Sequence, residues 1–118
     1  MKKTIRIALA ALAFTALPAL ACDYPKRADI PNGATASKEE MLAGQAAVKA
    51  YMSAMEEYLA CIEKDEVDTI ATMTDLSDEE RANREAALTK KYNAAVEEME
   101  LLAARFNEEV RAYKAKSE

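Results

Sequence analysis

The chain of 118 residues contains no histidine and no tryptophan, and it has only two glycines, three prolines and two cysteines. Without histidine, no serine or cysteine nucleophile can be activated by an imidazole base. The same absence removes the Glu-x-x-His motif of di-iron bundles and the histidine ligands of common zinc sites. Gly33 and Gly44 stand alone, which excludes a glycine-rich phosphate loop. We therefore expect a protein that is not an enzyme and that uses no cofactor and no metal.

Long apolar runs are also scarce, and the single one lies near the start of the chain. Ile7–Leu17 carries no charge, follows three basic residues within the first six positions, and ends at Pro18. The triplet Ala19–Ala21 then places small residues three positions and one position before Cys22. This pattern is typical of a cleavable bacterial signal peptide over residues 1–21. We expect export to the periplasm, with Cys22 as the first residue of the processed chain.

Basic residues are outnumbered by acidic ones, 16 to 21, which gives a formal net charge of −5. Loss of the signal peptide would remove three basic residues and lower that charge to −8. Nucleic-acid binding needs clustered lysine and arginine against phosphates, and docking on anionic lipid needs a basic face. Beyond residue 22 the apolar runs are too short to cross a bilayer. We therefore expect no nucleic-acid partner and no membrane span.

Two segments have apolar side chains at helical spacing, each introduced by a capping box. The boxes Ser37–Glu40 and Ser77–Glu80 predict helices that begin at residues 38 and 78. The first helix covers about 38–65, with a weaker continuation to 73 through three threonines, and the second covers 78–116. Rows with a seven-residue repeat predict the interface between the helices, formed by Met41, Val48, Met55 and Ile62 on the first and by Tyr92, Met99, Phe106 and Tyr113 on the second.

The predicted fold class is all-α, a long antiparallel two-helix hairpin over residues 37–118 with a coiled-coil-like crossing. It is preceded by an extended arm over residues 22–36, which contains two prolines and a turn at Ile30–Gly33. A two-helix hairpin has no enclosed centre, so its broad apolar stripes need a cover. The arm, a second copy forming a homodimer, or another envelope protein would supply that cover.

The two cysteines are within reach of each other in this fold. The helix from Ser37 to Cys61 rises about 36 Å. The segment from Cys22 to Ser37 spans at most about 50 Å when extended. An arm that turns back along the helix can therefore join Cys22 to Cys61, and an even number of cysteines in an exported chain favours that disulfide. The alternative is a lipid anchor at Cys22, although Leu20 departs from the usual residues before a lipoprotein cysteine.

Several short motifs together give the chain a resemblance to a known group. They include Ile30-Pro31-Asn32-Gly33, Tyr58-Leu59-x-Cys61 and Tyr92-Asn93-Ala94-Ala95-Val96-x-Glu98-Met99. With these motifs the chain resembles small uncharacterised exported helical proteins of Gram-negative bacteria, and the similarity covers most of the processed chain. The resemblance implies export and a helical hairpin, and it carries no known activity.

Broad apolar stripes on few helices, with no reactive group of residues, suggest contact through helix faces. Our leading expectation is a non-enzymatic periplasmic protein that acts as an adaptor, an assembly protein or a structural protein. An envelope lipoprotein anchored through Cys22 is the alternative. A carrier of a small apolar ligand is a third hypothesis, because methionine adapts readily to such ligands. In such a carrier, the ligand would lie in a gap between the helices lined by Met52, Met55, Met99 and Phe106.

Overall fold

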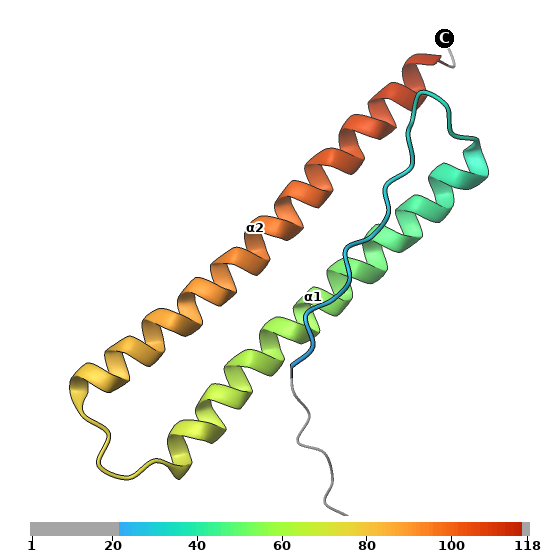
Figure 1. Cartoon of the computed structure of the whole chain (residues 1–118). Coiled ribbons are helices and arrows are strands. Elements are labelled where there is room, and N and C mark those ends of the chain that lie inside the picture. The colour runs from blue at the N-terminus through green and yellow to red at the C-terminus, as the bar shows by residue number, and fades with distance from the viewer. Residues whose placement is uncertain (1–21, 117–118) are drawn as a thin grey trace, which may run out of the picture.

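The structure of the protein, a computed structural model, describes residues 22–116, and the predicted signal peptide lies outside the described residues. Two helices, α1 (Lys38–Thr72) and α2 (Asp78–Lys116), run antiparallel to each other. An extended arm over residues 22–37 runs along them before α1 begins (Figure 1). Residues 22–116 contain no strand. The predicted all-α hairpin with an extended arm is confirmed.

Both helices begin with a reciprocal capping box. The Ser37 Oγ accepts from the Glu40 amide at 3.1 Å, and the Ser37 amide donates to Glu40 Oε2 at 2.7 Å. At α2 the corresponding bonds of Ser77 and Glu80 measure 3.1 and 2.9 Å. Each box satisfies amides that have no partner within the helix. These local bonds explain why both helices begin where the sequence predicts.

The first helix continues through the threonine-rich segment to Thr72. The amide of Met73 then donates to the carbonyl oxygen of Ile70 at 3.0 Å, which closes the last turn. Asp75, in the link between the helices, has a φ of 60°. Aspartate tolerates this left-handed conformation better than most residues. The weaker continuation expected after residue 65 is therefore fully helical.

The core lies between the two helices along much of their length. Its buried members are Tyr51, Met55, Leu59 and Ile62 from α1 and Ala95 and Leu102 from α2. The Phe106 ring of α2 lies close to Gly44, near the start of α1. At the other end, Ile62 and Leu88 line one hollow. These pairs show the antiparallel register, since the start of α1 meets the end of α2.

The arm forms a third layer over one face of the hairpin (Figure 1). Its residues Cys22, Ala28 and Ile30 pack against the core from that side. The arm begins beside Cys61, in the second half of α1, and runs toward the start of that helix. It therefore covers the groove between the helices beside the first part of α1 and the last part of α2.

Candidate functional site

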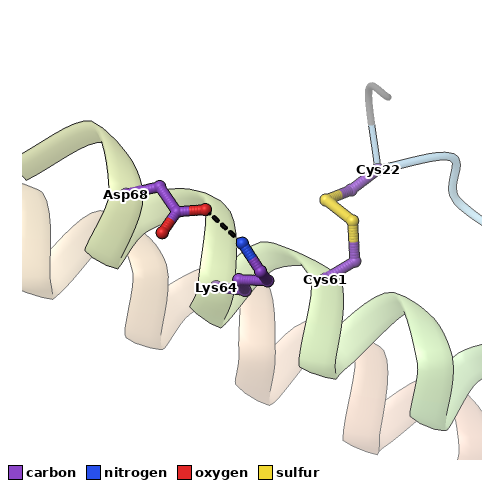
Figure 2. Close-up of a disulfide and its surroundings, with 4 residues drawn as sticks. All are labelled: Cys22, Cys61, Lys64 and Asp68. Atoms are coloured by element: carbon purple, nitrogen blue, oxygen red, sulfur yellow. Dashed lines mark hydrogen bonds and ion pairs between the residues drawn. A yellow bond between two sulfur atoms is a disulfide. The ribbon is translucent and has the colours of Figure 1, made fainter. Parts of the chain in front are cut away.

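The arm is fixed at its beginning by a disulfide between Cys22 and Cys61 of α1 (Figure 2). The two Cα atoms lie 5.7 Å apart, and the cysteines are separated by 39 positions in the sequence. The arm reaches Cys61 because it reverses at Asn32, whose carbonyl oxygen accepts from two later amides. Beside the disulfide, Lys64 and Asp68 form an exposed ion pair on α1. The hydrogen bond to Asp68 raises the pKa of Lys64.

At its other end the arm approaches the backbone of α2 very closely. The amide of Gly33 donates to Oε2 of Glu109 at 2.6 Å. A Cβ atom on Gly33 would lie only 1.8 Å from the carbonyl oxygen of Glu109. Nearby, Nζ of Lys116 donates to the carbonyl oxygen of Ala36. The arm is thus held by a covalent bond at one end and by polar contacts with α2 at the other.

The second glycine also marks a close approach. A Cβ atom on Gly44 would lie 2.6 Å from Cδ of Pro31, and the Phe106 ring lies 3.5 Å from the same point. Gly44 therefore sits where the arm, α1 and α2 meet. Both glycines of the chain are buried at contacts between different segments.

Three tyrosines gather where the arm crosses α1. The ring centroids of Tyr24 and Tyr58 lie 5.0 Å apart, and their planes meet at 72°. Tyr51, which is 4% exposed, lies close to Tyr24. Partial burial, together with the nearby Tyr51 and Glu98, raises the pKa of Tyr24. The residue as a whole remains 51% exposed.

A hollow of about 380 Å³ adjoins this tyrosine pair and the disulfide. Its lining is mainly apolar, formed by two aromatic rings, a proline, an alanine and the two cysteines, and two carboxylates lie among them. None of the residues that line it is basic. We call it the tyrosine hollow, and its residues are Cys22, Asp23, Tyr24, Pro25, Ala54, Glu57, Tyr58 and Cys61.

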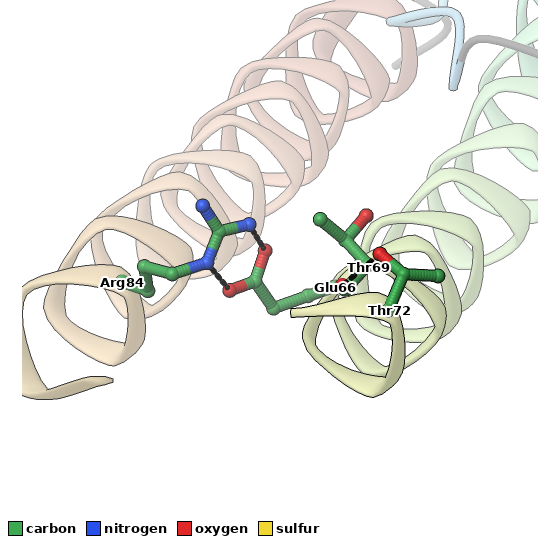
Figure 3. Close-up of polar contacts among 4 residues, drawn as sticks. All are labelled: Glu66, Thr69, Thr72 and Arg84. Atoms are coloured by element: carbon green, nitrogen blue, oxygen red, sulfur yellow. Dashed lines mark hydrogen bonds and ion pairs between the residues drawn. The ribbon is translucent and has the colours of Figure 1, made fainter. Parts of the chain in front are cut away.

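Nearer the loop that connects the two helices, one ion pair with two hydrogen bonds joins α1 to α2. Nε and Nη2 of Arg84 donate to Oε1 and Oε2 of Glu66 at 2.8 and 2.9 Å (Figure 3). Thr72 Oγ1 donates to the carbonyl oxygen of Thr69 at 2.7 Å in the last turn of α1. A paired guanidinium and carboxylate has directional geometry, so this contact helps to fix the register of the hairpin.

One flank of α2 carries partly exposed apolar residues. The arm meets α2 near Leu102 and Arg105 and at Glu109. Successive helical residues are about 100° apart, which places another set of side chains on the flank away from these contacts. We call this set the α2 flank, and it consists of Tyr92, Val96, Met99, Ala103 and Val110, all partly buried.

The residues predicted to form the helix interface differ in burial between the two helices. The α1 residues Met41, Val48, Met55 and Ile62 are buried, with exposed fractions of 7, 9, 0 and 8%. The α2 residues Tyr92, Met99, Phe106 and Tyr113 are only partly buried. Ala95 and Leu102, in the neighbouring row of α2, are the fully buried ones. Ala95 and Leu102 therefore lie at the centre of the contact, and the four predicted α2 residues lie at its margin.

Sequence reasoning missed the contact between Gly33 and Glu109 and the edge contact between Tyr24 and Tyr58. Both join residues that are far apart in the sequence, so no local pattern reveals them. The scarcity of glycine was the available clue for the first contact. A buried glycine without a positive φ marks a place where another segment comes close.

Within residues 22–116, no three histidine, cysteine, aspartate or glutamate side chains are grouped to hold a metal ion. Neither described helix has a stretch long and apolar enough to cross a membrane. Comparisons with family models, curated proteins and solved structures gave no significant match. A functional proposal therefore rests on the geometry of this chain.

Proposed function

We propose that this chain is an exported, non-enzymatic protein of the bacterial periplasm that acts as an adaptor, an assembly protein or a structural protein. The α2 flank carries the proposal. Its apolar side chains lie on the side of α2 away from the arm. Tyr92, Val96 and Met99 also pack against the core, and all five keep part of their surface in solvent. Apolar side chains that keep accessible surface along one side of a helix are candidates for contact with a partner. A second copy of the chain or another envelope protein would complete the interface.

The basic start and the apolar run of residues 1–21 support export, and so does the disulfide, because such bonds persist in oxidising compartments. The disulfide also bears on the lipoprotein alternative. While the sulfur of Cys22 is bonded to Cys61, it cannot form a thioether to a lipid. The unanchored form is therefore the better supported of the two.

Site-specific photo-cross-linking in living cells tests this proposal. A photoreactive amino acid is placed at Val96 on the α2 flank or at Leu101, which is 52% exposed elsewhere on α2. We expect a discrete cross-linked species from position 96 and none from position 101. In the same preparation, the intact mass of the periplasmic protein should correspond to a chain that begins at Cys22.

A charged variant of the α2 flank tests whether the cross-link reflects specific contact or random encounters between proteins. Met99→Glu should abolish the cross-link from position 96, because a carboxylate on the α2 flank disfavours apolar contact. Glu97→Gln, an exposed change nearby, should leave the cross-link unchanged. Equal cross-linking from positions 96 and 101, or none from either, would contradict contact through this flank.

A further inference from the structure

We propose that the tyrosine hollow binds the quaternary ammonium group of a small soluble cation of the choline type. The hollow brings together two aromatic rings from distant segments, one from the arm and one from α1. Quaternary ammonium groups bind against the faces of aromatic rings, because the ring quadrupole attracts positive charge that is only weakly hydrated. This site is independent of the α2 flank and of the function proposed for it.

The orientation of the rings supports this ligand class. The rings of Tyr24 and Tyr58 meet edge to face, with their centroids 5.0 Å apart and their planes at 72°, so the ring that presents its edge keeps both of its own faces uncovered by its partner. Tyr24 is 51% exposed, so about half of its surface is open to solvent. The neighbouring disulfide fixes the part of the arm that carries Tyr24.

Charge complementarity gives the second argument. Asp23 and Glu57 contribute the two charged groups of the lining, and both residues are exposed. The nearest lysine along α1, Lys64, is paired with Asp68 and does not line the hollow. An anionic or zwitterionic ligand would face unfavourable charge here, whereas a monocation would be attracted. Choline is therefore expected to bind better than betaine, whose carboxylate adds a negative charge.

Titration of the oxidised protein with choline, followed by NMR, tests the assignment. We expect upfield shifts of the ligand N-methyl protons and a dissociation constant of about 1 mM. The neutral isostere 3,3-dimethylbutan-1-ol, which has the same shape without the charge, should bind at least about fivefold more weakly. Methylammonium, which is small and strongly hydrated, should also bind more weakly than choline.

Matched variants locate the site. Tyr24→Leu should weaken choline binding at least about fivefold, whereas Tyr24→Phe should stay within about twofold because it keeps the ring. Glu57→Gln should weaken binding about threefold, while its neighbour Glu56→Gln should have no effect. Far-UV circular dichroism and thermal melts establish that each variant is folded. The proposal fails if choline and its neutral isostere bind equally, or if Tyr24→Leu, shown to be folded, binds like the wild type.

Discussion

At the scale of single residues, steric contact decides the choice of Gly33. Its φ is not positive, so an L-residue could adopt the backbone conformation. The constraint comes instead from the backbone of α2, which would lie 1.8 Å from an added Cβ atom. The amide of Gly33 also bonds to Glu109, which leaves little freedom for the arm to move away.

We expect Gly33→Ala to destabilise the oxidised protein by about 1 to 2 kcal/mol. Alanine would reduce the entropy of the unfolded chain by about 0.4 to 1 kcal/mol, but overpacking against a backbone costs about 1 to 3 kcal/mol. Urea unfolding followed by circular dichroism measures the difference. Ala34→Ser, at the exposed neighbouring position, should change stability by less than about 0.5 kcal/mol. A gain in stability for Gly33→Ala would show that the arm is not held against α2.

Glu80 makes the start of α2 sensitive to acid. Hydrogen bonding with Ser77 lowers the pKa of Glu80. A lowered folded pKa means that the box contributes fully above the unfolded carboxyl pKa of about 4.3 and is lost as the pH falls through the folded value. We therefore expect the protection of the first-turn amides of α2, measured relative to their intrinsic exchange rates at each pH, to fall as the pH drops below the unfolded carboxyl pKa.

Two glutamate variants test the role of this carboxylate. Glu80→Gln should flatten the pH response, because the amide oxygen still accepts from Ser77 but does not titrate. Glu79→Gln, which keeps the box, should retain the response. NMR exchange measurements across the transition compare the two. If the response persists in Glu80→Gln, another group controls the start of the helix.

At the scale of elements, local hydrogen bonding made the helix starts predictable. The end of α1 and the packing of α2 depend on long-range contacts, which the sequence does not reveal. Ser37 and Ser77 specify their boxes within four residues, so the sequence alone suffices. The threonines after Asp68 have weak helix propensity, yet α1 continues to Thr72. The cross-helix pair of Glu66 with Arg84 provides support in this region that helix propensity does not include.

The packing of α2 was less predictable for a similar reason. A seven-residue repeat identifies which side of a helix is apolar, but it does not say which row lies at the centre of the contact. The structure centres the contact on Ala95 and Leu102 and leaves Met99 at the margin. The row of Ala95 and Leu102 has the same seven-residue spacing as the row of Met99, so the repeat alone did not distinguish them. The tyrosine hollow could not be predicted, since it needs the exact path of the arm.

The stability losses of two methionine variants should distinguish a core position from one at the margin of the interface. Met55→Ala should cost about 2 to 5 kcal/mol, because Met55 is fully buried and its removal leaves a cavity. Met99→Ala should cost less than about 2 kcal/mol, because this side chain is only partly buried. Chemical denaturation of both variants gives the comparison. Equal large losses would place Met99 in the core of the isolated chain and weaken the interaction proposed for the α2 flank.

At the scale of the whole molecule, the disulfide turns a two-layer hairpin into a three-layer structure. The arm supplies apolar residues to the core but has no regular secondary structure of its own. Without the covalent bond, its docking must overcome the backbone entropy of an extended segment. The link between Cys22 and Cys61 lowers that entropy in the unfolded chain, and it also holds the tyrosine hollow together.

Removal of the disulfide should therefore affect stability more than helix content. A loop closed across 39 positions corresponds to about 4 kcal/mol in the chain-entropy model. We expect the double variant Cys22→Ser, Cys61→Ser to lose about this much in urea unfolding, and the reduced wild-type protein should behave similarly. Far-UV circular dichroism at low temperature should still show the two helices, since the capping boxes and most of the core are unchanged. The amide of Gly33, which is hydrogen-bonded to Glu109 in the oxidised protein, should lose protection from exchange before the amides of the helices do. If the double variant matched the oxidised protein in stability, contacts such as Gly33 with Glu109 would be sufficient to dock the arm, and the disulfide would not be its main anchor.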